Sequence, residues 1–276
     1  GTILSGTYIT DGPGTHTHDD VEANVKNYTH GMFQSIYDYP YLSSSANHIL
    51  DITSGYSARS DLSSSSNVQN SKKINIYNQM AQMLVGHDLN GDIRDFDQNG
   101  DMLDAGGVKY KEAMFLSFSR LLTKDEIKKG SFEMTLGVGE AFATPFSSKV
   151  VVKDLNAQND YRINSPAGEY AVLYMSNSKE EPINEANMPT NWQSTGNYYA
   201  CGLLYYQAGI AVLDSKLFYK NVSGQHDGLL SASVDWFEPN DRTASDKGNS
   251  TVSGGVGYAL KSEEITGSAF ALRHRI

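Results

Sequence analysis

Cysteine and long apolar runs are scarce in this sequence. The single cysteine, Cys201, excludes an internal disulfide and is typical of a chain that folds in a reducing cytosol. It stands in the apolar run YYACGLLYY, so we expect a buried, unreactive thiol. No stretch approaches the roughly 18 apolar residues of a membrane-spanning helix. The sequence starts at Gly1 without a methionine or a charged n-region, which predicts no signal peptide and a processed or truncated start.

Basic residues are also in short supply. The 22 lysines and arginines face 32 acidic residues, which gives a formal net charge of −10. A protein that grips duplex DNA through its phosphates needs a basic face. The nearest approaches to one are Lys128-Lys129 and Arg273-His274-Arg275. We therefore expect no direct contact with nucleic acid, and the acidic balance favours solubility.

The signatures of common enzyme classes are missing as well. The sequence contains no Gly-x-Ser-x-Gly nucleophile elbow, no Walker loop and no complete G-x-G-x-x-G fingerprint. Gly137-Val138-Gly139 comes nearest to the last of these but lacks the third glycine. We expect a noncatalytic chain without a cofactor.

The clearest pattern that the sequence does contain lies between Lys109 and Gly139. Bulky apolar side chains recur at every second position in residues 114–118 and 132–138, which predicts two strands. Between them Thr123-Lys-Asp-Glu126 matches a helix capping box, and Gly130 stands where a short helix would end. We expect this strand, helical turn and strand to form the centre of the fold.

One amphipathic helix is predicted over residues 72–85, capped by Ser71 and ended by Gly86. Its apolar stripe consists of Ile74, Tyr77, Met80, Ala81 and Leu84. Short apolar runs separated by turn residues fill the rest of the chain. The fold class predicted is therefore mainly β (α+β), with an antiparallel sheet or sandwich-like core. We expect a single domain over 1–276, in which 1–60 is an extended N-terminal arm, 61–276 is the β-rich core and 88–107 is an exposed polar insertion.

The arm is the segment to which we assign contacts between subunits. From residue 33 to residue 56 aromatic residues alternate with polar ones, and Pro40 excludes a central strand at its own position. Tyrosine buries a ring while its hydroxyl stays wet, which suits such contacts. The predicted contact residues are Phe33, Ile36, Tyr37, Tyr39, Tyr41, Leu42, Ile49 and Tyr56.

Two short motifs suggest metal sites, and each has a plainer alternative. Asp95-Phe-Asp97-Gln-Asn99-Gly100-Asp101 matches the opening of an EF-hand calcium loop, but Gly106 stands where the bidentate glutamate belongs. An exposed turn explains the same residues. His16-x-His18-x-Asp20 is part of the metal motif of metallo-β-lactamase-type hydrolases, but Val21 replaces the histidine that should follow. A polar loop is the alternative there.

Five segments together resemble virion structural proteins of contractile-tailed phages of the marine, cyanophage type. They are residues 27–57, 71–86, 115–138, 165–174 and 202–213. The resemblance implies a many-copy particle component that is assembled in the bacterial cytoplasm and carried on the virion. Its partners would be other copies of itself and other virion proteins, and its acidic charge favours an outer tail, neck or baseplate position. The family pattern supplies no catalytic residue.

Two other function classes remain open at this stage. A metal-dependent hydrolase or depolymerase would use His16, His18 and Asp20. A receptor- or carbohydrate-binding module would use exposed aromatic residues around Trp192 or Trp236.

Overall fold

The computed structural model describes residues 23–28, 33–60, 63, 70–102, 109–119, 125–138, 148–177, 194–195, 198–214, 272–273 and 276. Over these residues the protein is mainly β with one helix, α1 (Asn70–Leu84), so the predicted fold class is confirmed. The strands are β1 (Val25–Asn27), β2 (Phe33–Tyr37), β3 (His48–Tyr56), β4 (Phe96–Asp97), β5 (Lys109–Tyr110), β6 (Glu112–Phe118), β7 (Glu133–Val138), β8 (Ser148–Lys153), β9 (Arg162–Ser165), β10 (Gly168–Asn177), β11 (Ser194–Thr195), β12 (Tyr198–Tyr205) and β13 (Ile210–Asp214).

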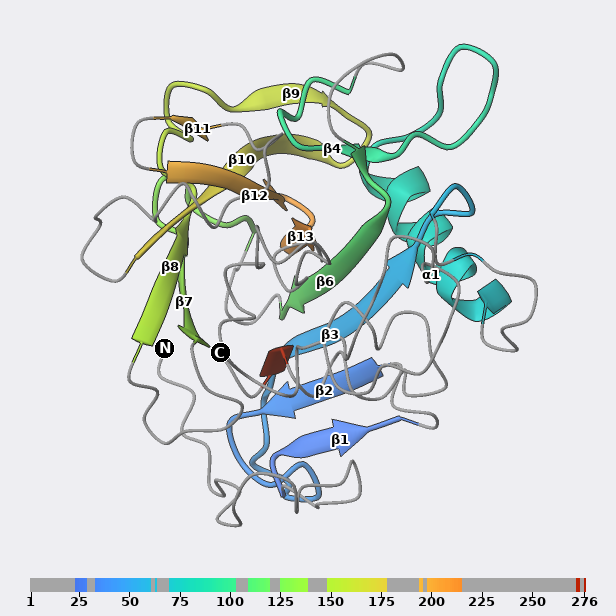
Figure 1. Cartoon of the computed structure of the whole chain (residues 1–276). Helices are drawn as coiled ribbons and strands as arrows, with labels where there is room; N and C mark the ends of the chain where they lie inside the picture. The colour runs from blue at the N-terminus through green and yellow to red at the C-terminus, as the bar shows by residue number, and fades with distance from the viewer. Residues whose placement is uncertain are drawn as a thin grey trace, which may run out of the picture.

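Most of these strands belong to one antiparallel sheet. Its main path runs β1-β2-β3-β6-β13-β12-β10-β8-β7, while β9 adds to β10 and β11 adds to β12. The strands β4 and β5 form a separate short ladder. Figure 1 shows that the β7–β8 end runs steeply across the direction of β1 and β2, as the cumulative twist of a many-stranded sheet requires.

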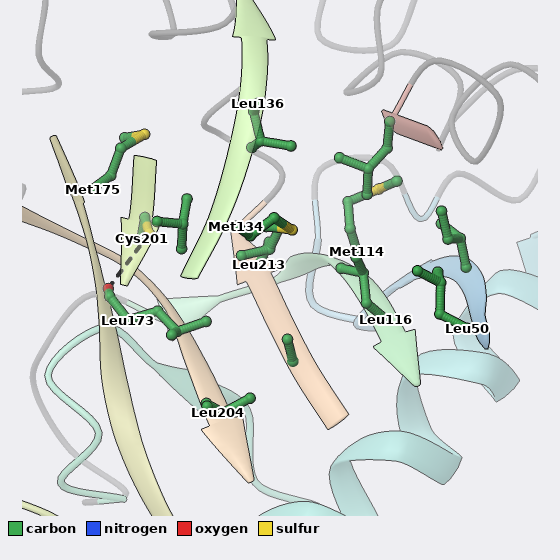
Figure 2. Close-up of a cluster of buried hydrophobic side chains, with 14 of the residues drawn as sticks. Leu50, Met114, Leu116, Met134, Leu136, Leu173, Met175, Cys201, Leu204 and Leu213 are labelled. Carbon is green, nitrogen blue, oxygen red and sulfur yellow. Dashed lines mark hydrogen bonds between the residues drawn. The ribbon is translucent and has the colours of Figure 1, made fainter. Parts of the chain in front are cut away.

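The sheet has an apolar cluster on each face. One, which we call the inner cluster, contains side chains from every strand of the main path between β2 and its far end at β7. Leu50, Met114, Leu173 and Leu136 belong to it. Because the sheet curls, residues from strands distant in the sheet order meet in this one cluster (Figure 2). The other, the helix-side cluster, lies between the sheet and α1. All five residues of β13 are buried, which explains its apolar run IAVL, and the strand ends on the buried Asp214.

Helix α1 confirms the prediction over 72–85 closely. Tyr77, Ala81 and Leu84 are buried, and Gly86 ends the helix with a φ of +79°. Glycine suits this left-handed position because it has no Cβ to clash. Lys73 lies four residues before Tyr77 on the same stripe, and it is fully buried.

Gly55 of β3 is a point where α1 approaches the sheet closely. A Cβ atom at this position would lie 2.7 Å from the Lys73 carbonyl oxygen and 2.8 Å from the Tyr77 backbone nitrogen. Both are backbone atoms, so relief requires the whole helix to shift. We expect Gly55→Ala to lower the free energy of unfolding by about 1–3 kcal/mol, the usual cost of overpacking. Urea denaturation measures it, with Ser45→Ala in the exposed loop after β2 as control. Equal midpoints for the two variants would contradict the close contact.

The predicted extended arm is wrong for residues 33–56. Residues 33–37 and 48–56 form β2 and β3, which pair in antiparallel register, and β3 continues into the sheet centre by pairing with β6. Ile36 and Tyr56 are buried in the inner cluster rather than offered to a neighbour. The boundary at residue 60 between arm and core therefore has no counterpart in the fold. Residues 1–22 of the predicted arm lie outside the described residues.

Two predictions about the middle of the chain also need correction. The exposed insertion 88–107 is only partly exposed, since Phe96, Gln98 and Met102 are buried against the sheet. The two strands predicted to form the centre of the fold do not lie together. β6 lies at the centre of the sheet, whereas β7 lies at one end of the main path. The capping residue Thr123 lies outside the described residues, and residues 125–132 contain turns, with Gly130 at a φ of +75°.

Candidate functional site

The loop between β2 and β3, residues 38–47, carries the most exposed of the predicted contact residues. Leu42 is 86% exposed and Tyr39 is 56% exposed, although both are apolar or aromatic. Phe33, Tyr37, Tyr41 and Ile49 are half-buried. Of the eight predicted contact residues, Tyr39 and Leu42 are thus the two that are exposed rather than buried or half-buried. We call residues 39–42 the contact loop.

The contact loop has a fixed base. Asp38 accepts hydrogen bonds from the Asn47 backbone nitrogen at 2.6 Å and from Asn47 Nδ2 at 2.8 Å, which closes the loop. These bonds favour the charged carboxylate and hold the pKa of Asp38 below its usual value. The Tyr41 backbone nitrogen donates to the Ala23 carbonyl at 2.9 Å, which ties the loop to the chain before β1. The exposed tip is therefore held in place from both sides.

Aromatic contacts support the loop from below. The Tyr37 ring lies 6.3 Å from the Tyr41 ring and 5.5 Å from the imidazole of His48, measured between centroids. His48 Nε2 is 2.8 Å from Asp51 Oδ1, and the Ser35 hydroxyl donates to the same carboxylate. A preorganised apolar tip of this kind loses little conformational entropy on binding a partner.

The calcium-like segment 95–101 is occupied by the protein's own cations. Asp95 pairs with Arg59 at 2.9 Å and accepts a bond from the Tyr77 hydroxyl. This partnership raises the pKa of Arg59 above its usual value. Asp97 is buried and pairs with Lys109. Among the described residues no group of three or more histidine, cysteine, aspartate or glutamate side chains could hold a metal ion.

The remaining residues of that segment bond to one another and to the sheet. Asn99 Nδ2 donates to the Asp101 carboxylate at 2.8 Å, and the Asp101 backbone nitrogen donates to Asn99 Oδ1 at 3.0 Å. The Arg162 guanidinium donates to the Asn99 carbonyl, and the Tyr170 hydroxyl donates to the Gly100 carbonyl at 2.7 Å. The arrangement ties the segment to β9 and β10.

A buried lysine and serine form a polar pair that the sequence analysis missed. Lys73 Nζ donates to the Ser54 hydroxyl at 2.6 Å and to the Ser54 carbonyl at 3.1 Å. Burial removes the ammonium group from water and lowers the pKa of Lys73 to about 7. The spacing of Lys73 from Tyr77 and Ala81 was the available signal, because it places the lysine on the buried stripe.

Asp154, directly after β8, anchors the turn before β7. Its carboxylate accepts bonds from the Gly130 backbone nitrogen at 2.6 Å, the Phe132 backbone nitrogen at 3.0 Å and the Tyr206 hydroxyl at 3.0 Å. Burial raises the pKa of Asp154 above its ordinary value despite these bonds. It also raises the pKa of Tyr206. Sequence reading gave no signal for this role, because its partners lie more than twenty residues away.

Lys129 adds a second attachment for the same turn. Its ammonium group pairs with Glu169 and lies 4.8 Å from the Tyr161 ring centroid and 5.5 Å from that of Tyr206. The hydrogen bond to Glu169 raises the pKa of Lys129, and the same bond lowers the pKa of Glu169. Because the two charged groups neutralise each other, we assign this ion pair a structural role.

The other candidates fall in two groups. Cys201 is buried, and its Sγ lies 3.4 Å from the Leu173 carbonyl oxygen, so the predicted buried thiol is confirmed (Figure 2). Burial raises the pKa of Cys201, which keeps it protonated and unreactive. His16, His18, Asp20, Trp192 and Trp236 lie outside the described residues.

Comparison with known proteins adds no relative. No family model, curated protein or solved structure matches the chain. Within the described residues, no helix is long and apolar enough to cross a membrane.

Proposed function

We propose that this chain is a noncatalytic structural subunit of a phage virion, placed in the tail, neck or baseplate. It acts by assembling with copies of itself and with other virion proteins, without direct contact with nucleic acid. The proposal assigns the finished protein to the virion and its assembly to the host cytoplasm.

The observation that carries the proposal is where the five phage-like segments lie in the fold. Four of them contribute to β2, β3, β6, β13, β12 and β10, which are six consecutive strands of the main path, and residues 115–138 also supply β7 at the end of that path. The fifth, residues 71–86, supplies α1, which packs on β3. Segments dispersed over nearly 190 positions thus form one packed unit. Because the five segments pack together in this way, the resemblance supports a shared fold better than isolated short motifs would.

The contact loop provides a surface for assembly, whereas the segments on either side of it, residues 33–37 and 48–56, are sheet strands. Its tip exposes Tyr39 and Leu42, which stand on either side of Pro40 and Tyr41 in the sequence. Tyrosine is among the residues that most often anchor a protein interface, and the apolar Leu42 beside it would be removed from water by a partner. The acidic net charge of the chain supports an outer position, because a surface that lines DNA is typically basic.

Light scattering across a concentration series tests the proposal. We expect the unmodified chain to associate, and Leu42→Glu to weaken association by at least about tenfold, because the new carboxylate would be buried against an apolar partner. Leu89→Glu is the matched control, since Leu89 is 95% exposed on a different loop. It should leave association unchanged.

Two outcomes would count against this function. A chain that stays monomeric at its highest soluble concentration and is missing from purified particles would overturn the structural role. Stoichiometric zinc or iron that is lost on His16→Ala would instead favour the metal-dependent hydrolase. Binding to a glycan, with loss on replacing Trp192 or Trp236, would favour the receptor- or carbohydrate-binding module.

A further inference from the structure

Two buried side chains from the β4–β5 ladder each keep a polar atom without a hydrogen bond. Gln98 directly follows β4 and Tyr110 ends β5, and neither side chain is exposed to solvent. Within the part of the chain that the structure describes, Gln98 Oε1 and the Tyr110 hydroxyl have no hydrogen-bond partner. Buried polar atoms in native proteins are nearly always paired, either with the protein or with ordered water. These two atoms therefore require an explanation.

Both residues lie against the same part of β12. Gln98 Nε2 donates to the Ala200 carbonyl at 3.2 Å, so the amide group of Gln98 is fixed beside that strand. Tyr110 and Ala200 both belong to the helix-side cluster. The ladder holds the two residues near each other, because Phe96, the register partner of Tyr110, stands only two positions before Gln98.

Electrostatics places the Tyr110 hydroxyl in the same neighbourhood. Burial raises the pKa of Tyr110, and the negative charge of Asp214 raises it further, with a smaller contribution from Tyr174. Tyr174 is the register partner of Ala200 on β10, and Asp214 ends β13, the strand on the other side of β12. Such effects weaken with distance, so the hydroxyl lies close to this end of β12.

The chemistry of the two atoms suits water. An amide oxygen only accepts hydrogen bonds, whereas a tyrosine hydroxyl both donates and accepts. A water molecule can donate one hydrogen to Gln98 Oε1 and accept the hydrogen of the Tyr110 hydroxyl. It carries no net charge, so its burial avoids the desolvation cost of an ion. Among the described residues no cluster of side chains fit to hold a metal ion is present.

We propose that one ordered water molecule bridges Gln98 Oε1 and the Tyr110 hydroxyl, and so completes the attachment of the β4–β5 ladder to β12. Internal waters typically satisfy buried polar groups in this manner. The site does not include the contact loop, so it is independent of the proposed assembly role.

Tyr110→Phe distinguishes a hydrated hydroxyl from one without any partner. Phenylalanine keeps the ring and removes only the oxygen. Loss of a bridging water should raise the equilibrium constant for unfolding at least about fivefold, because the hydrogen bonds of the hydroxyl are lost. Urea denaturation measures this constant. An unchanged or lower constant would overturn the proposal, since removing an unpaired buried hydroxyl carries no such cost.

A double-mutant cycle tests whether the two residues share the water. Gln98→Met keeps the length of the side chain and removes its amide group. In Gln98→Met/Tyr110→Phe the unfolding constant should be at least about threefold smaller than the product of the two single effects predicts, because either change alone already removes the bridge. Tyr205→Phe, another buried hydroxyl of the helix-side cluster, replaces Tyr110→Phe in the control cycle and should be additive with Gln98→Met. Additivity in both cycles would overturn the shared site.

Oxygen-17 magnetic relaxation dispersion detects the water itself, because it counts water molecules that stay inside the folded protein. The double variant should hold one fewer than the unmodified chain, since an apolar cavity stays dry. Equal counts would overturn the proposal, because any coupling would then come from a direct bond between the side chains. If the double variant does not fold, the effect of Tyr110→Phe on the unfolding constant decides.

Discussion

Asp154→Ala is expected to lower the free energy of unfolding by about 3–5 kcal/mol. Its carboxylate accepts three hydrogen bonds, from Gly130, Phe132 and Tyr206, and Asp154 is buried. Alanine would leave all three donors without this acceptor: the buried Tyr206 hydroxyl costs about 1–3 kcal/mol when unsatisfied, and each of the two partly exposed backbone bonds contributes about 0.5–1.5 kcal/mol. The turn before β7 would lose its attachment to the end of β8. Chemical denaturation at neutral pH measures the change.

The same network offers internal controls. Tyr206→Phe removes only one of the three donors, so it should cost about 1 kcal/mol. The double variant Asp154→Ala/Tyr206→Phe should cost less than the sum of the two single changes, because both remove the same bond. Asp160→Ala, at an exposed position a few residues later, should change stability by less than about 0.5 kcal/mol. A similar cost for Asp154→Ala and Asp160→Ala would refute the anchoring role.

Elements with one buried face could be predicted from the sequence. Helix α1 shows its apolar positions at spacings of three and four, and the structure begins and ends it within two residues of the prediction. The strands β6 and β7 were likewise visible from alternation. Alternation cannot reveal the order of strands in a sheet, however. This is why β6 and β7, neighbours in the sequence, proved to lie far apart in it.

The prediction failed where polar residues are buried in pairs. β2 and β3 contain Ser35, Asp51 and Thr53, which suggested an exposed arm. In the fold these strands pair with each other, and the Ser35 hydroxyl donates to the Asp51 carboxylate across them. A buried polar group that has a partner loses the cost that normally keeps it at the surface. Such partners come from other strands, so a single stretch of sequence does not contain them.

The prediction for segment 95–101 failed for the same reason. Asp95 and Asp97 indicated an exposed turn or a calcium loop, but Arg59 and Lys109 neutralise them from other parts of the chain. These cations lie 36 and 12 residues away, respectively. The interior therefore includes charged pairs, and the apolar fraction of 39% does not show which polar residues are buried in this way.

Lys73 is the interior group for which pH should have the largest effect. Burial lowers its pKa to about 7, from 10.5 in the unfolded chain. Between these values the unfolded chain binds a proton that the folded chain does not, so the free energy of unfolding rises with pH. One proton corresponds to about 1.4 kcal/mol per pH unit. We expect the unmodified chain to gain on the order of 2–3 kcal/mol from this group between pH 7 and pH 9.

Lys73→Met isolates that contribution. Methionine keeps the length and the apolar stem but cannot titrate, so its stability should lack this rise with pH. The titration of Cys201 in the unfolded chain opposes the rise near pH 9, yet it is common to both proteins and cancels in their difference. At pH 9 the variant should be the less stable of the two, because the Ser54 hydroxyl and carbonyl lose their donor. Urea denaturation of both proteins at pH 7, 8 and 9 gives the comparison. Two parallel profiles would show that Lys73 is charged in the folded protein, and that the contact between α1 and β3 is open to water.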